Sequence, residues 1–179
     1  MENKKQSFEQ LIIGIIVVII GIILDQYTKF LAITKLKDRP ISIIDGVFEL
    51  QYLENKGAAF GILQNQQWLF LLIGIPFSII AFLFYIRLPK TKKMLPVRYC
   101  VLFTITGTIG NLIDRIRFSY VVDFLYFKLI DFPIFNVADI FVSVSAIIIV
   151  ILLIFVYNES EIDQMLNIKR KKYKLDYKE

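Results

Sequence analysis

Asp123 and Asp139 are the residues of this sequence best suited to chemistry, because each is a carboxylic acid placed in or beside apolar sequence. Asp123 stands in residues 121–125 (VVDFL) and Asp139 in residues 135–140 (FNVADI). An ionised carboxylate in such surroundings is costly unless it has a partner or a function. Two aspartates that folding brings together at a membrane surface can divide the acid and base roles of a hydrolysis between them.

The sequence lacks the residues that several other catalytic mechanisms require. The sequence has no histidine and one cysteine, Cys100. It therefore offers no histidine-based triad, no Cys/His dyad and no usual zinc ligand set. We expect Cys100, in an apolar run, to be a small buried hydrophobic residue, and we expect neither a metal nor an organic cofactor.

The composition indicates a membrane protein. Of the 179 residues, 56% are hydrophobic, whereas a soluble domain has roughly 45–50%. The net charge of +5 is distributed in short basic segments beside apolar ones, a pattern that orients membrane proteins. We therefore expect membrane lipid, and no nucleic acid, as a partner.

Four apolar segments are predicted to cross the membrane in one integral-membrane domain. They are residues of about 11–30, 68–86, 97–113 and 136–157, followed by a cytoplasmic tail at 158–179. Each approaches the 20 or so residues that a helix needs to cross about 30 Å of hydrocarbon. The first segment also resembles a signal peptide, but no small-residue cleavage pattern follows it, so we interpret it as an uncleaved span.

The basic residues predict the orientation of these spans. The segment from Arg87 to Arg98 has five basic residues and no acid, which places it in the cytoplasm together with both termini. Residues 34–67 and 114–135 then lie outside. With this topology four acids gather at the outer leaflet: Asp25, Asp114, Asp123 and Asp139.

The outer segments have the pattern of a small β-sheet lying on the membrane. Residues 41–44 and 47–52 have the pattern of two strands, and Asp45 and Gly46 between them suit a tight turn. Residues 121–127 are β-branched and aromatic, and a third strand here would hold Asp123 on a firm backbone. The predicted fold is membrane α-helical, with four transmembrane helices and this outer sheet.

Several polar residues have both a structural and a functional interpretation. Asn55 and Gly57 belong to residues 55–61 (NKGAAFG), which suit a plain turn or a close approach to a ligand. Asn111 and Asp114 share one face of the third span. Asp114 and Arg115 either fasten helix ends, by pairing with Lys29 or Asp25, or take part in the site.

The start of the fourth span has a polar side made of Asn136, Asp139 and Ser143, at i, i+3 and i+7. Helix capping explains Asn136 and favours an acid in the first turn. Capping does not explain why Asp139 stands between Ala138 and Ile140, so we favour a functional interpretation of Asp139.

Five ordered motifs resemble those of the bacterial lipoprotein signal peptidase family, also called signal peptidase II. They are residues 25–29 (DQYTK), 55–61 (NKGAAFG), 110–115 (GNLIDR), 122–124 (VDF) and 135–139 (FNVAD). The resemblance covers residues of about 25–149. Ser119 departs from the pattern, since the family commonly has glycine there.

The resemblance implies roles for the residues that match. Asp123 and Asp139 would form the catalytic dyad of an aspartic endopeptidase. The residues implied in substrate binding or dyad support are Asn55, Gly57, Asn111, Arg115 and Asn136. Asp25, Lys29 and Asp114 would be structural polar residues.

The resemblance also implies the substrate and the compartment. The substrate would be a prolipoprotein cut before a cysteine that bears a diacylglyceryl group, and the enzyme would be a monomer in the bacterial cytoplasmic membrane with its site at the outer leaflet. Two other classes remain open, a small proton-coupled transporter and a membrane assembly protein whose acids lock helices together.

Overall fold

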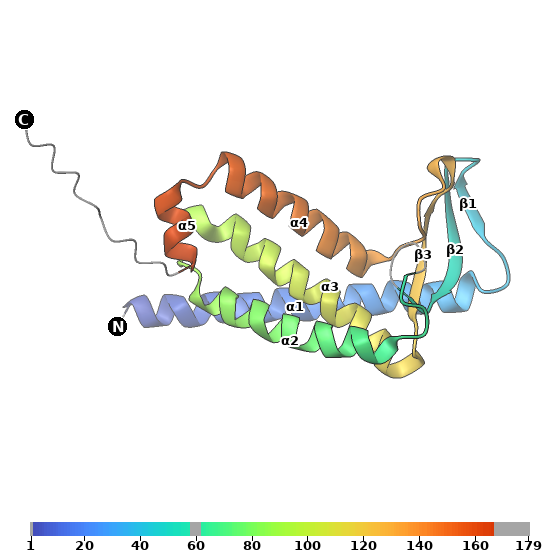
Figure 1. Cartoon of the computed structure of the whole chain (residues 1–179), viewed down its shortest axis with the longest axis horizontal. Coiled ribbons are helices and arrows are strands. Elements are labelled where there is room, and N and C mark those ends of the chain that lie inside the picture. The colour runs from blue at the N-terminus through green and yellow to red at the C-terminus, as the bar shows by residue number, and fades with distance from the viewer. Residues whose placement is uncertain (1, 58–61, 167–179) are drawn as a thin grey trace, which may run out of the picture.

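The computed structural model of the chain describes residues 2–57 and 62–166. Its long helices lie side by side with a small sheet at one end (Figure 1). The helices are α1 (Glu2–Lys35), α2 (Gln67–Arg87), α3 (Leu95–Phe118), α4 (Val137–Phe155) and the short α5 (Glu159–Leu166), with 3-10 turns η2 (Lys92–Met94) and η3 (Lys128–Ile130). The strands are β1 (Ile41–Ile44), β2 (Phe48–Asn55) and β3 (Val121–Phe127).

Within the described residues, three helices are long and apolar enough to cross a membrane: Phe8–Lys35 of α1, α2 and α4. Their outward side chains are aliphatic, for example Ile20, Ile80 and Ile154, each at least 60% exposed. Water would not favour such a surface, whereas lipid does. The prediction of a membrane α-helical protein with a small sheet is confirmed.

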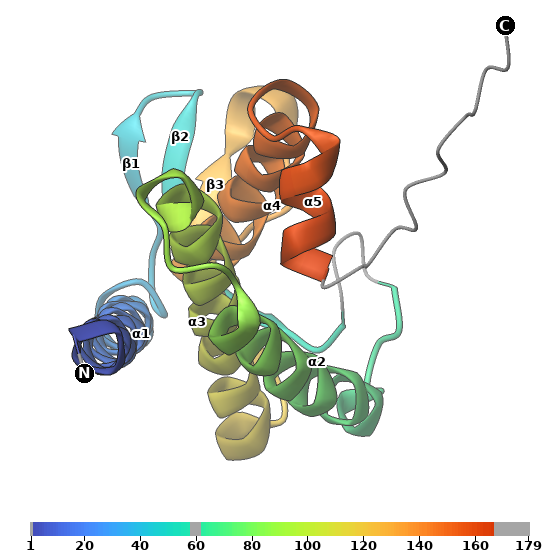
Figure 2. The same cartoon turned by 90° about the vertical axis from the view of Figure 1, so that its left-hand side faces the viewer.

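The predicted third span corresponds to α3, which is long enough to cross but less apolar than the other three helices. It packs against α1, α2 and α4 and lies between α1 and α2 in the end-on view (Figure 2). Gly107 and Gly110 allow this close packing, because a Cβ at Gly107 would meet the carbonyl of Ala138 and a Cβ at Gly110 the carboxylate of Asp25. Three polar residues of α3, Arg98, Thr106 and Asp114, are at most 4% exposed and are thus surrounded by protein.

The sheet has the order β1-β2-β3, and both pairs of strands are antiparallel. A tight turn joins β1 to β2, with Gly46 at a φ of 73° and a hydrogen bond of 2.9 Å from Val47 N to the oxygen of Ile44. β2 continues to Asn55, three residues beyond the predicted strand. Because Leu53 pairs with Asp123, Asn55 lies close to Asp123.

β3 follows α3 along the chain and leads through η3 to α4. Ser119 ends α3 in the left-handed conformation, at a φ of 63°, which explains why glycine suits this position. After η3, Phe135 forms a bridge with Leu125, so that α4 starts beside β3. Asp123 and Asp139 therefore come from neighbouring element ends.

Arg98 belongs both to the basic segment predicted to be cytoplasmic and to the predicted third span, and in the structure it is buried. It lies in α3, is 4% exposed, and donates hydrogen bonds to the carbonyls of Tyr85 and Leu88 at 3.3 and 3.1 Å. These carbonyls end α2 and lack helical partners, and a cation is favoured at that helix end. The exposed basic residues of this segment are therefore Arg87, Lys90, Lys92 and Lys93. The basic tail beyond residue 166 lies outside the described residues.

Candidate active site

Asp123 lies on β3 with its carboxylate held from two sides. Asn55 Nδ2 donates to Asp123 Oδ2 at 2.8 Å, and Asn136 Nδ2 donates to Oδ1 at 2.6 Å. The residue is 1% exposed. Both amide donors stabilise the ionised form, while burial opposes it.

Asp139 lies in the first turn of α4. Asn111 Nδ2 donates to Asp139 Oδ1 at 2.8 Å, and the backbone N–H of Asn136 donates to Oδ2 at 3.2 Å. Asn136 Oδ1 in turn accepts from the backbone N–H of Asp139 at 3.0 Å, which completes a capping box. Asp139 thus belongs to the cap, and one residue, Asn136, fixes both carboxylates.

Both aspartates line one cavity of about 740 Å³ between the sheet and the helices. Of the predicted supporting residues, Asn55, Gly57, Asn111 and Arg115 line this cavity as well. Asn136 is 0% exposed and contacts both aspartates from the protein interior. Residues 58–61 of the second motif lie outside the described residues.

The pKa of Asp123 is raised to about 7. The largest cause is burial, which disfavours the charged form, and the negative charge of Asp139 acts in the same direction. The hydrogen bonds from Asn55 and Asn136 oppose the shift. A carboxyl group that holds its proton near neutral pH can serve as an acid or a base there.

Gly57 and Arg115 form one wall of the cavity. The N–H of Gly57 donates to Asn55 Oδ1 at 2.9 Å, and its carbonyl accepts from Arg115 at 3.4 Å. A Cβ at Gly57 would come within 2.6 Å of the Ile62 carbonyl, so the turn requires glycine. Arg115 stacks over Phe70 at 4.2 Å and, within the described residues, its buried Nε has no hydrogen-bond partner.

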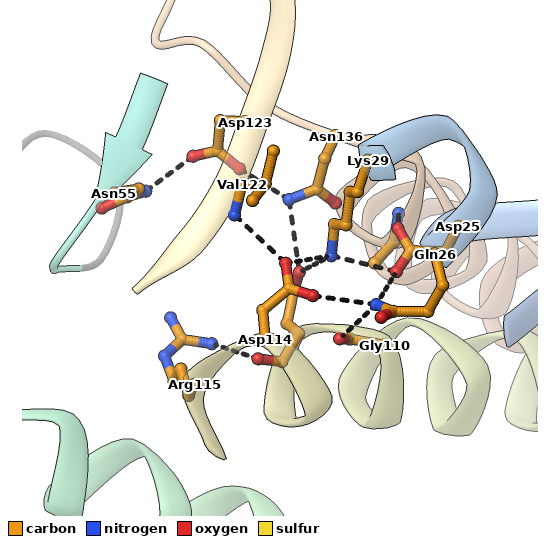
Figure 3. A network of polar contacts seen from close by, with 12 residues as sticks. Asp25, Gln26, Lys29, Asn55, Gly110, Asp114, Arg115, Val122, Asp123 and Asn136 are labelled. Carbon is orange, nitrogen blue, oxygen red and sulfur yellow. Dashed lines mark hydrogen bonds and ion pairs between the residues drawn. The ribbon is translucent and has the colours of Figure 1, made fainter. Parts of the chain in front are cut away.

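Near Asp123 and Asn136 lies a buried ionic cluster of Lys29, Asp25 and Asp114 (Figure 3). Lys29 Nζ is 2.9 Å from Asp25 Oδ2, 3.0 Å from Asp114 Oδ2 and 2.9 Å from Asn111 Oδ1. All three charged residues are at most 2% exposed. Because the one cation contacts both carboxylates and also holds Asn111, the cluster supports the amide that contacts Asp139.

The two carboxylates of this cluster also hold the elements that carry the dyad. Asp25 Oδ1 accepts from the backbone N–H of Ala138 at 2.9 Å, and Asp114 Oδ2 accepts from that of Val122 at 3.1 Å. Ala138 and Val122 directly precede Asp139 and Asp123. The cluster therefore fixes the backbone on which each dyad residue stands.

Sequence reasoning gave no role to Gln26, although it lies in the first motif. Its Nε2 donates to Asp114 Oδ1 at 2.8 Å, to Asp25 Oδ2 at 3.2 Å and to the Gly110 carbonyl at 3.3 Å. The positions of Asp25 and Lys29 in the sequence do not indicate that Gln26 also faces the interior. The described residues contain no group of His, Cys, Asp or Glu side chains suited to a metal.

The family model described as Signal peptidase (SPase) II matches residues 17–155 of this chain. The lipoprotein signal peptidase of Clostridium tetani is 45% identical over 145 residues, which cover 78% of this chain and 91% of the relative. That of Clostridioides difficile is 40% identical over 151 residues, which cover 84% and 99%.

A solved structure described as a bacterial membrane enzyme, determined by the in meso method at 2.3 Å, has a TM-score of 0.70 to this chain. It is 30% identical, and the match covers 90% of this chain and 94% of that one. A second, at 1.9 Å, has a TM-score of 0.69 and is 31% identical, covering 80% and 94%. The chain belongs to the signal peptidase II family, which is a family of peptidases.

Replacement of the buried cation should test the ionic cluster. Lys29→Met leaves Asp25 and Asp114 without a counter-charge, so we expect the free energy of unfolding to fall by about 3–5 kcal/mol. The matched control is Lys128→Met, which removes a lysine that is 51% exposed and pairs with Glu49 at 2.7 Å; its effect should stay below about 1 kcal/mol. Thermal melting in detergent measures both, and equal effects would contradict a stabilising role for the cluster.

Proposed function

We propose that this protein is an intramembrane aspartic endopeptidase that removes the signal peptide from diacylglyceryl-modified prolipoproteins, cutting before the lipidated cysteine. The family supports the reaction and the substrate class. The observation that carries the catalytic assignment is that two carboxylates, the buried Asp123 of β3 and the half-buried Asp139 of α4, line the same cavity. Cleavage of a purified lipidated prolipoprotein, followed by gel shift, tests the proposal.

The proposed mechanism requires the dyad to hold one proton. Asp123 and Asp139 repel each other when both are ionised, and burial adds to this cost, so the pair retains a proton. The ionised member removes a proton from a water molecule, which attacks the scissile carbonyl carbon. The protonated member donates its proton to the developing oxyanion. The member that took a proton from the water then gives that proton to the leaving amine, and the first member recovers its own as the new carboxyl group forms. Asn136 keeps the two carboxylates at a fixed separation throughout.

The other cavity residues have proposed roles in binding. Asn55, Gly57 and Asn111 would offer polar atoms to the extended peptide, whose own polar groups need partners away from water. Arg115 carries a positive charge at the wall beside both carboxylates and would stabilise their shared negative charge. Asp25, Lys29 and Asp114 would be structural.

We place the enzyme in the bacterial cytoplasmic membrane as one domain with four crossing helices, both termini cytoplasmic and the site at the outer leaflet. The successive helices run in opposite directions, and α5 lies at the same end as the start of α1 (Figure 1). The solvated basic segment between α2 and α3 lies at that end too, which favours a cytoplasmic location for it. We expect a monomer without a cofactor or nucleic acid partner.

A transporter or an assembly protein is less well supported. A proton relay would need acids near the middle of the spans, whereas the dyad lies beside the sheet at the end of the helices. Acids that only lock helices would have cationic partners, as Asp25 and Asp114 do. Asp123 and Asp139 instead contact neutral amides.

Substitution of either dyad residue should separate catalysis from folding. Asp123→Asn and Asp139→Asn each remove the acid/base group, so turnover should fall at least about 100-fold. Each variant loses like-charge repulsion but turns one amide donor toward another donor, and we expect melting temperatures within a few degrees of wild type. Steady-state cleavage and thermal melting measure the two effects. Substantial turnover by either variant would refute the dyad.

The pH dependence should follow the shared proton. The folded state keeps a proton on Asp123 up to about pH 7, while the unfolded chain loses it near its ordinary value of about 3.9. The folded state thus binds more protons in this window, so its stability falls as pH rises from about 4 to about 7. We expect kcat/KM to decline above about pH 7, and stability to decline less in Asp123→Asn. A flat rate profile between about pH 6 and 9 would contradict this.

Single cysteines should report the orientation in a variant whose Cys100 is replaced by alanine. We expect a cysteine at position 45, in the hairpin turn, to react with an impermeant maleimide from outside intact cells. A cysteine at position 92 should react only after the membrane is opened. The reverse pattern would place the site at the inner leaflet.

A further inference from the structure

A second cavity of about 440 Å³ lies between α2, α3 and α4. α2 and α4 both pack on α3 and make little contact with each other, so α3 forms the floor of this space. Its lining is mainly apolar, with Phe70, Ile73, Phe77, Leu112 and Val142. Four residues line both this cavity and the one above the dyad: Asn111, Arg115, Asp139 and Ser143.

Ser143 is the member of these four whose polar group is unused. Asn111, Arg115 and Asp139 all form hydrogen bonds in the site. The Ser143 hydroxyl has no hydrogen bond within the part of the chain that the structure describes, and the residue is exposed. Several hydroxyls of α1, α2 and α3 donate to a carbonyl of their own helix, namely Thr28, Thr34, Ser78, Thr104, Thr106 and Thr108.

The Ser143 hydroxyl stands where the polar cavity above the dyad meets the mainly apolar second cavity. Ser143 follows Asp139 by one helical turn, which places it about 6 Å further along α4. Since α4 runs away from the sheet (Figure 1), the hydroxyl lies below the dyad, toward the membrane interior. A ligand that occupies both cavities would place a polar group beside this hydroxyl and an apolar part in the second cavity.

We infer that Ser143 is a specificity-determining residue whose hydroxyl donates to an ester carbonyl of the diacylglyceryl group. This inference rests on the proposed function, in which the lipidated cysteine lies next to the scissile bond. An ester has no N–H, so one donor satisfies it, whereas a peptide group in this apolar cavity would keep an unpaired donor. The first methylenes of an acyl chain would then pack against Phe70, Phe77 and Val142.

The test compares ester-linked and ether-linked diacylglyceryl prolipoproteins, because the ether removes the acceptor carbonyl. On the ester substrate, Ser143→Ala should raise KM about threefold to tenfold with kcat unchanged, the range expected for one hydrogen bond. On the ether substrate, wild type should already show the raised KM and Ser143→Ala should add nothing. Ser143→Thr, which keeps a hydroxyl, should restore the ester value.

The matched control is Ser145→Ala, which removes a hydroxyl from the same helix at a residue that is 3% exposed and lines neither cavity. It should leave KM unchanged on both substrates. An unchanged KM in Ser143→Ala, or an equal rise on both substrates, overturns the inference while the proposed function stands. Failure of the wild type to cleave either substrate would instead overturn the proposed function, and the inference with it.

Discussion

The arrangement of the site depends on one buried ammonium group, that of Lys29. It lies within 3.0 Å of carboxylates from α1 and α3, and those carboxylates accept backbone N–H groups that precede both dyad residues. In a medium of low dielectric constant such a cluster is stable only when each charge is compensated by a partner or hydrogen bonds. The positions of four separate elements are thereby fixed by a single charge.

The same charge also affects the chemistry of the dyad. Lys29 lowers the pKa of Asp123 electrostatically, against the larger effects of burial and of Asp139. It also holds the side-chain oxygen of Asn111, which leaves the amide nitrogen to donate to Asp139. The orientation of that amide follows from the lysine, since an ammonium group accepts no hydrogen bond. The ionic cluster and the two candidate catalytic aspartates therefore form one connected network.

Much of the fold could be predicted from the sequence because its signals are local. Alternating residues around Asp45 and Gly46 predicted β1 and its turn, and uninterrupted apolar runs predicted α2 and α4. The sequence indicates less about residues whose positions depend on contacts with distant parts of the chain. The sequence does not predict the burial of Arg98, because its partners are carbonyls at the end of α2. It does not predict the contacts of Gln26 with α3 either, because they join distant parts of the chain.

The candidate site shows the same division. Asp123 and Asp139 stood out because acids are rare in apolar sequence, and the family motifs supplied their companions. The bridging position of Asn136 could not be read from its spacing, which predicts only the helix cap. Its contact with Asp123 exists because Phe135 pairs with Leu125 and brings the start of α4 against β3, a tertiary pairing with no local pattern.

The central position of α3 has a consequence for how the protein is made. A helix that carries Arg98, Asn111 and Asp114 partitions poorly into lipid by itself, whereas α1, α2 and α4 are apolar enough to do so. The short connection through η2 and the bonds from Arg98 to the end of α2 join α3 to its predecessor. We therefore expect α2 and α3 to leave the translocon as a hairpin, and the Lys29 cluster to form only when that hairpin meets α1.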